Sequence, residues 1–135
     1  KPNKIATVMQ PSHTGTDRLS AIILEYDNSI AQITTAIGVE IPYSAAIYGT
    51  KGHMIIPKFK DPSEVIINID DGSSRVIAQD YQSTGFEFQI REAENCLRAG
   101  KIYSEIMNPD QTIAVMEIMD GARESWQMTF PFEQN

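Results

Sequence analysis

The sequence has little of the material from which chemical sites are usually built. Its 135 residues include one cysteine and two histidines. A single cysteine excludes an internal disulfide framework and is typical of a reducing compartment, so we expect a cytoplasmic protein. There is no apolar run long enough to cross a bilayer, and no signal peptide is recognisable.

Positive charge is scarce as well. Eleven lysines and arginines stand against 18 aspartates and glutamates, which gives a formal net charge of −7. This balance argues against binding to nucleic acid and to anionic membrane surfaces. The hydrophobic content of 41% is ordinary for a globular domain, and the length allows a domain with its own core.

The motifs of common enzyme sites are missing. His13, His53 and Cys96 are scattered without metal-ligand spacing, and no nucleophile elbow or GxGxxG fingerprint occurs. The segment 49–52 (GTKG) lacks phosphate-loop spacing, and no helix follows it, so we interpret it as a hairpin turn. We therefore predict no catalytic, metal-binding or cofactor-binding residue in this chain.

The last third of the chain contains its two clearest helices, and the first is expected from Phe86 to Ala99. Thr84 and Glu87 have the spacing of a capping box, and Gly100 suits the position after the helix end. An apolar stripe at helical spacing indicates one buried face. The stripe consists of Phe86, Ile90, Ala93 and Leu97.

The second helix is expected from Pro109 to about Trp126. Asn108 is a good N-cap, Pro109 fits the first helical position, and Gln111 completes a capping box. Gly121 weakens the helix but allows close packing. A wide apolar stripe predicts burial over much of the circumference; it contains Ile113, Val115, Met116, Ile118, Met119, Ala122 and Trp126.

The chain before these helices reads as about seven strands. Asp27, Asn28 and Ser29 mark the turn of the clearest hairpin, and the pair Asp70 and Asp71 is interpreted as turn chemistry rather than as an acid–base pair. The fold class is α+β: an open-faced, mostly antiparallel sheet with helices packed on one face. We expect homodimers or higher homo-oligomers through the uncovered face. The expected strands are 4–10, 18–26, 30–37, 41–48, 53–56, 64–69 and 74–78.

From Gly49 onward the sequence resembles the C-terminal domain of the Gfo/Idh/MocA oxidoreductases, and most of all the branch that includes dihydrodiol dehydrogenase. The ordered series of matching segments is specific, although no single motif decides it. The segments are 49–52 (GTKG), 55–57 (IIP), 85–86 (GF), 96–101 (CLRAGK), Ser104, 110–112 (DQT), 116–120 (MEIMD), Trp126 and 129–132 (TFPF).

The resemblance implies an NAD(P)-dependent enzyme of two domains. An N-terminal Rossmann domain binds NAD or NADP. The C-terminal domain, with the glyceraldehyde-3-phosphate dehydrogenase-like fold, shapes the pocket for a small-molecule substrate such as a sugar, polyol or diol. Residues 1–135 would form that domain as a single unit. Lys1 and Pro2 echo the family's Glu-Lys-Pro motif without its glutamate or following helix, so we expect an inactive fragment of a longer enzyme.

The resemblance also indicates two substrate-facing positions, near Phe59 and Tyr81. Both lie in loops: one follows the 49–52 hairpin and the other precedes the first helix. A different interpretation stays open, in which the chain is a stand-alone, non-catalytic binding or oligomerisation module that uses its sheet face. A small hydrolase or isomerase is disfavoured, because no acid–base constellation is readable. The length of the natural gene product separates the first two hypotheses.

Overall fold

The computed structural model describes residues 1–81, 83–130 and 133, and the chain divides into two compact units. The first unit contains Lys1–Ile41 and Glu105–Asn135, and the second contains Pro42–Ser104. Strands precede helices as predicted, which confirms the α+β class. The elements are β1 (Lys4–Pro11), β2 (Asp17–Tyr26), β3 (Ser29–Ala36), β4 (Ala45–Gly49), β5 (Gly52–Ile56), β6 (Glu64–Ile69), β7 (Ser74–Ala78), α1 (Phe86–Arg98) and α2 (Pro109–Ser125).

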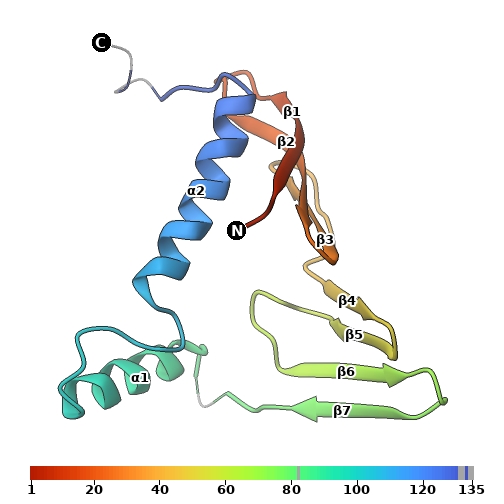
Figure 1. Cartoon of the computed structure of the whole chain (residues 1–135), viewed down its shortest axis with the longest axis vertical. Coiled ribbons are helices and arrows are strands. Elements are labelled where there is room, and N and C mark those ends of the chain that lie inside the picture. The colour runs from red at the N-terminus through yellow and green to blue at the C-terminus, as the bar shows by residue number, and fades with distance from the viewer. Residues whose placement is uncertain (82, 131–132, 134–135) are drawn as a thin grey trace. The chain divides into compact units, whose positions relative to one another are not determined.

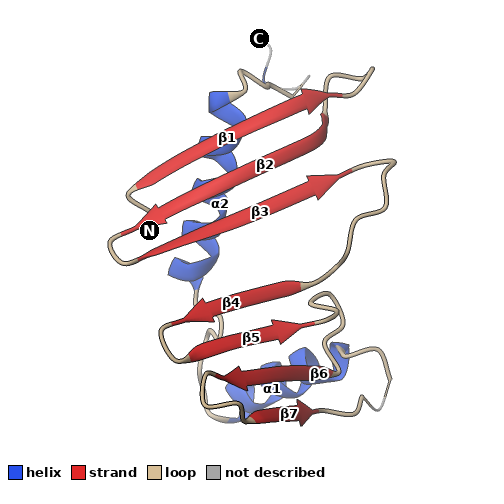
Figure 2. Ribbon diagram, turned by 90° about the vertical axis from the view of Figure 1, so that its right-hand side faces the viewer, coloured by secondary structure: helices blue, strands red, loops and turns tan. Residues whose placement is uncertain are grey.

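The strands form two antiparallel sheets, with the orders β1-β2-β3 and β4-β5-β6-β7 (Figure 2). The sequence predicted the antiparallel pairing but not the division into two sheets. In the first sheet Tyr26 pairs with Ser29, so the predicted turn contains Asp27 and Asn28, while Ser29, also expected in the turn, begins β3. The expected strand 41–48 begins only at Ala45.

The start of α2 follows the prediction. The Asn108 side chain accepts a hydrogen bond from the Gln111 backbone N–H at 2.9 Å. The Asn108 backbone N–H donates in return to the Gln111 side-chain oxygen at 3.0 Å. This reciprocal pair satisfies two backbone donors that the helix itself leaves unpaired, which is why the helix begins here.

Helix α2 packs on one face of the β1–β3 sheet, where the core of the first unit lies (Figure 1). The Trp126 indole N–H donates to the Thr7 hydroxyl at 2.9 Å, which fixes the end of the helix on β1. Leu24 and Ala122 are buried at this interface. Ser20 is the buried polar residue among those described, and its hydroxyl is paired with that of Thr35 at 2.6 Å.

The second unit is built on tight turns. Gly52 pairs with Gly49 at the end of the β4–β5 hairpin and has a φ of 142°. A Cβ atom here would lie 2.1 Å from the backbone oxygen of Asn68, so only glycine fits. In the next hairpin the Asp71 carboxylate accepts the Ser73 N–H at 2.8 Å. Hydrogen bonding to the Ser73 side chain, and to a lesser extent to this N–H, holds the pKa of Asp71 below its ordinary value. Asp71 is therefore a turn residue, as predicted.

The N-terminal cap of α1 differs from the prediction. The N-cap residue is Gly85, with a φ of 89°, and not Thr84. Glu87 does accept backbone N–H groups, but it accepts them from Ser83 and Gly85. The predicted Thr84 capping box is wrong, because the left-handed glycine turns the chain one residue later. The C-terminal end is as predicted, since the Lys101 N–H donates to the carbonyl of Cys96 around Gly100.

The apolar stripe predicted for α1 lies on its exposed side. Phe86, Ile90 and Leu97 are 64%, 65% and 77% exposed, whereas Cys96 is buried. Neither α1 nor α2 is long and apolar enough to cross a membrane.

We expect Gly121→Ala to stabilise the fold. An added Cβ would lie 3.4 Å from the Ile5 Cδ1 atom, which is ordinary van der Waals contact, and alanine is the better helix former. The free energy of unfolding, measured by urea denaturation, should rise by up to about 1 kcal/mol. Gly52→Ala is the contrasting variant and should lower it by more than about 1 kcal/mol. A loss of stability in Gly121→Ala would show that β1 and α2 pack more tightly than described.

Candidate functional site: a pocket at the start of α1

The second unit contains a pocket of about 410 Å³, within the usual size range of small-molecule sites. It lies between the loop after β5, the loop after β7 and the first turn of α1. Polar groups from all three segments reach it. These are the side chains of Lys60, Asp61, Gln79, Thr84 and Gln89.

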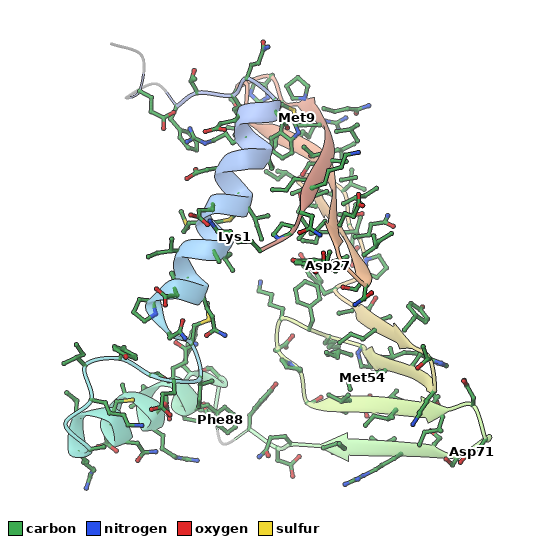
Figure 3. The ribbon with its side chains drawn as sticks, viewed as in Figure 1. Lys1, Met9, Asp27, Met54, Asp71 and Phe88 are labelled. Atoms are coloured by element: carbon green, nitrogen blue, oxygen red, sulfur yellow. The ribbon has the colours of Figure 1, made fainter. Side chains whose placement is uncertain are left out.

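Aromatic side chains supply the apolar part of the lining, and Tyr81, Phe86 and Phe88 contribute it. The ring of Tyr81 meets that of Phe88 edge to face, with centroids 6.0 Å apart. The guanidinium of Arg91, one turn further along α1, lies 6.0 Å from the centre of the Phe88 ring. Figure 3 places Phe88 at the end of α1 that the segment from β7 enters. Phe88 is thus held by contacts with both the loop and the helix.

Tyr81 is the polar group of the pocket with the most distinctive electrostatics. Burial raises the pKa of its phenol above the ordinary value of 10.0, and the negative charges of Asp61 and Glu87 raise it further. The phenol is therefore protonated at neutral pH. It can donate a hydrogen bond to a hydroxyl or carbonyl oxygen of a ligand, while the Asp61 carboxylate can accept one.

The two residues predicted to face a substrate have different surroundings. Tyr81 lines the pocket, whereas Phe59 lies next to the lining residue Lys60 without being part of the wall. The Phe59 ring is tilted against that of Tyr43 at 6.4 Å, and its N–H donates to the Tyr43 carbonyl at 2.8 Å. Phe59 is 53% exposed, so it is not a core residue. That either side chain contacts a substrate stays a prediction.

The thiol of Cys96 is poorly suited to nucleophilic chemistry. Burial raises its pKa above the ordinary value, and the hydrogen bond to the Glu92 carboxylate at 3.5 Å adds to the effect. The same carboxylate accepts the Ser104 hydroxyl at 2.6 Å, so this cluster ties the segment after α1 to the helix. Within the described ranges 1–81, 83–130 and 133, no group of three or more His, Cys, Asp or Glu residues could hold a metal ion.

Comparison with known proteins connects this chain to a group of dehydrogenases. It is 29% identical to trans-1,2-dihydrobenzene-1,2-diol dehydrogenase of Mus musculus over 137 residues. It is 30% identical to the protein of the same name from Xenopus laevis over 138 residues, and both matches cover 97% of the chain. The chain is a homologue of these dihydrodiol dehydrogenases. The resemblance to their branch is therefore confirmed. No protein-family model matches the chain.

The chain spans about 40% of the length of the curated relatives it matches, namely 41% of the mouse protein and 42% of the Xenopus laevis protein. The match includes the region of the pocket, since it extends over nearly the whole chain. Two residues that close the predicted resemblance, Pro131 and Phe132, lie outside the described residues.

Most of the pocket lining could not be identified from the sequence. Phe86 was assigned to the apolar stripe of the first helix, and Phe88 was not singled out. Phe88 could have been singled out from the sequence, because it is an aromatic residue in the first turn of the predicted helix that does not belong to the apolar stripe. Lys60, Asp61 and Gln89 gave no comparable signal, because only the fold brings them next to Tyr81.

We predict that Tyr81 ionises later than an ordinary tyrosine. Because the pKa of Tyr81 is raised in the folded chain, the unfolded chain loses the phenol proton at a lower pH than the folded chain does. The free energy of unfolding is therefore unaffected below pH 10 and falls as the pH rises through the raised pKa. Tyrosine ionisation is followed spectroscopically in the unmodified chain and in the Tyr81→Phe variant. The difference between the two titration curves is the ionisation of the Tyr81 phenol. Above pH 10 the unmodified chain should lose stability relative to Tyr81→Phe. Ionisation at or below the ordinary value would contradict the prediction.

Proposed function

We propose that the chain is the C-terminal substrate-binding and oligomerisation domain of an NAD(P)-dependent oxidoreductase of the Gfo/Idh/MocA type. Its substrate would be a diol, polyol or sugar. The observation that carries this proposal is the similarity to trans-1,2-dihydrobenzene-1,2-diol dehydrogenases along 97% of the chain.

The chemistry of the pocket supports a substrate with hydroxyl groups on an apolar ring. Tyr81 can donate a hydrogen bond, and Asp61 and Gln89 can accept one, so adjacent hydroxyls could be held from more than one side. The rings of Phe86 and Phe88 offer an apolar surface to the remainder of such a molecule. The pocket volume of about 410 Å³ accommodates a single small ring.

In this proposal the cofactor belongs to a separate Rossmann domain of the same protein. Oxidation of an alcohol by NAD or NADP requires a hydride acceptor, which the cofactor supplies. The chain has no glycine-rich dinucleotide fingerprint. Its own role would be to bind and orient the substrate through the pocket at the start of α1. The Glu-Lys-Pro motif of the family, whose lysine assists hydride transfer, would lie near the junction of the two domains.

We expect the 135-residue chain to bind neither NADH nor NADPH. Fluorescence titration with micromolar cofactor should show no saturable change. The natural gene product, detected with an antibody to this chain, should be more than twice as large as 15.1 kDa, because a cofactor domain needs on the order of 100–150 further residues. That longer protein should bind the cofactor and oxidise trans-1,2-dihydrobenzene-1,2-diol. A natural product near 15 kDa would instead favour the stand-alone module.

The proposed oligomer would form through the β4–β7 sheet. Strand alternation and register place mainly aliphatic residues on one of its faces, and Arg75 is the charged residue among them. The opposite face is mixed, with His53, Asn68, Ser74 and Glu64 among its members. The aliphatic face is the more suitable for a second copy of the chain, because it would release more apolar surface from water. It contains Ala45, Ile47, Met54, Ile56, Val65, Ile67, Ile69 and Ile77.

Neighbouring residues on β7 allow a matched test of this interface. Ile77 lies on the aliphatic face and Val76 on the opposite one, and the two are similarly exposed at 45% and 55%. We predict that Ile77→Glu weakens self-association by at least about ten-fold, because the new carboxylate must be desolvated in the interface. Val76→Glu should leave it nearly unchanged. Sedimentation over a range of concentrations measures both, and a monomeric unmodified chain at high concentration would refute the proposed interface.

A further inference from the structure

The segment between β7 and α1 forms one wall of the pocket, and the Glu87 side chain attaches its last residues to the helix. Glu87, in the first turn of α1, accepts the Ser83 backbone N–H on one carboxylate oxygen at 3.1 Å. Its other oxygen accepts the Gly85 backbone N–H at 2.8 Å. The two donors flank Thr84, which lines the pocket, whereas Glu87 itself does not.

Glu87 is connected to the Tyr81 ring through two neighbouring residues, Gly85 and Phe88. A Cβ atom at Gly85 would lie 3.9 Å from a ring carbon of Tyr81, so the backbone that Glu87 holds is close to the tyrosine ring. The ring also packs against Phe88, the residue that follows Glu87 on the helix. The position of the Tyr81 ring therefore depends on how the loop is attached to the first turn of α1.

We propose that Glu87 is a positioning residue for this pocket. Its carboxylate fixes residues 83–85 on the start of α1, sets the places of Thr84 and Tyr81, and thereby determines the affinity for the substrate without touching it. This inference rests on the proposed substrate-binding role of the pocket.

The geometry requires a carboxylate of this length. Two oxygens are needed for two N–H donors, and each bond is strengthened by the negative charge. Glutamine keeps one acceptor oxygen but turns an NH₂ group toward the other donor. Alanine removes both acceptors. The loop should therefore be best ordered with glutamate, less ordered with glutamine and least ordered with alanine.

The experiment compares Glu87→Gln and Glu87→Ala with Glu94→Gln in the 135-residue chain. Glu94 lies on the same helix and pairs only loosely with Arg98, at 3.6 Å on an exposed surface, so it is a matched control. Hydrogen exchange at the Ser83 and Gly85 amides reports on the loop. Spectroscopic titration of Tyr81 reports on the surroundings of its ring. NMR titration with trans-1,2-dihydrobenzene-1,2-diol measures binding to the pocket.

We expect exchange at the two amides to be about ten-fold faster in Glu87→Ala, as for the loss of hydrogen bonds to a charged group, with Glu87→Gln between. The dissociation constant of the diol should rise at least about three-fold in Glu87→Ala, and the pKa of Tyr81 should move back toward its ordinary value. Glu94→Gln should match the unmodified chain in every measurement. Circular dichroism and the hydrogen exchange of amides in β5 and β6 should show that each variant is still folded. These controls separate the expected effects from general unfolding.

The outcomes distinguish the inference from the proposed function. Unchanged exchange at Ser83 and Gly85, or an unchanged Tyr81 titration, would overturn the positioning role of Glu87. Faster exchange with an unchanged diol affinity would overturn the claim that the loop determines binding. An unmodified chain that does not bind the diol would contradict the proposed function of the pocket, while the exchange at Ser83 and Gly85 would still decide whether Glu87 holds the loop.

Discussion

An apolar face of an antiparallel sheet gains free energy when it is covered, and each unit of the chain has such a face. In the first unit α2 covers one face of β1–β3, and the indole of Trp126 on Thr7 fixes where the helix ends. In the second unit the β4–β7 sheet has an aliphatic face whose members include the half-exposed Ile47, Ile69 and Ile77. The exposed aliphatic face connects the fold to the proposed assembly, because the same face of a second copy of the chain could bury it in an interface.

The candidate site is built from the ends of secondary structure elements and not from the sheets themselves. Two loops and the first turn of α1 bring Lys60, Tyr81 and Phe88 to one pocket. Loops place binding groups well only when something rigid holds them, and here the first turn of α1 does so through Glu87. The described lining residues offer hydrogen-bonding groups and aromatic rings to a small molecule. These groups suit the proposed role of a domain that binds the substrate while a cofactor carries out the redox chemistry.

Local signals in the sequence predicted the elements that depend on local interactions. The Asn108 and Gln111 capping box, the Gly100 helix end and the Asp27–Asn28 turn all involve residues within a few positions of one another, and the structure contains each of them. The Thr84 cap failed because a glycine with positive φ competes with it at the next position. Of the site, only Tyr81 was anticipated among the lining residues, and it came from the family resemblance. The other lining residues come from two segments, 60–62 and 79–89, which are about twenty positions apart, and no local sequence pattern indicates that these segments meet.

The sequence by itself determined the order and type of the elements, the antiparallel pairing and the relationship to dihydrodiol dehydrogenases, because these depend on short-range periodicity, turn residues and the ordered series of matching segments. The assignment of all 135 residues to a single domain stays a prediction. The tertiary structure alone decided that the strands form two sheets, that the stripe of α1 is exposed and that Tyr81 packs against Phe88 beside a pocket. The reason is physical: which apolar face is buried, and which side chains from distant loops meet, depends on long-range packing that no single segment encodes.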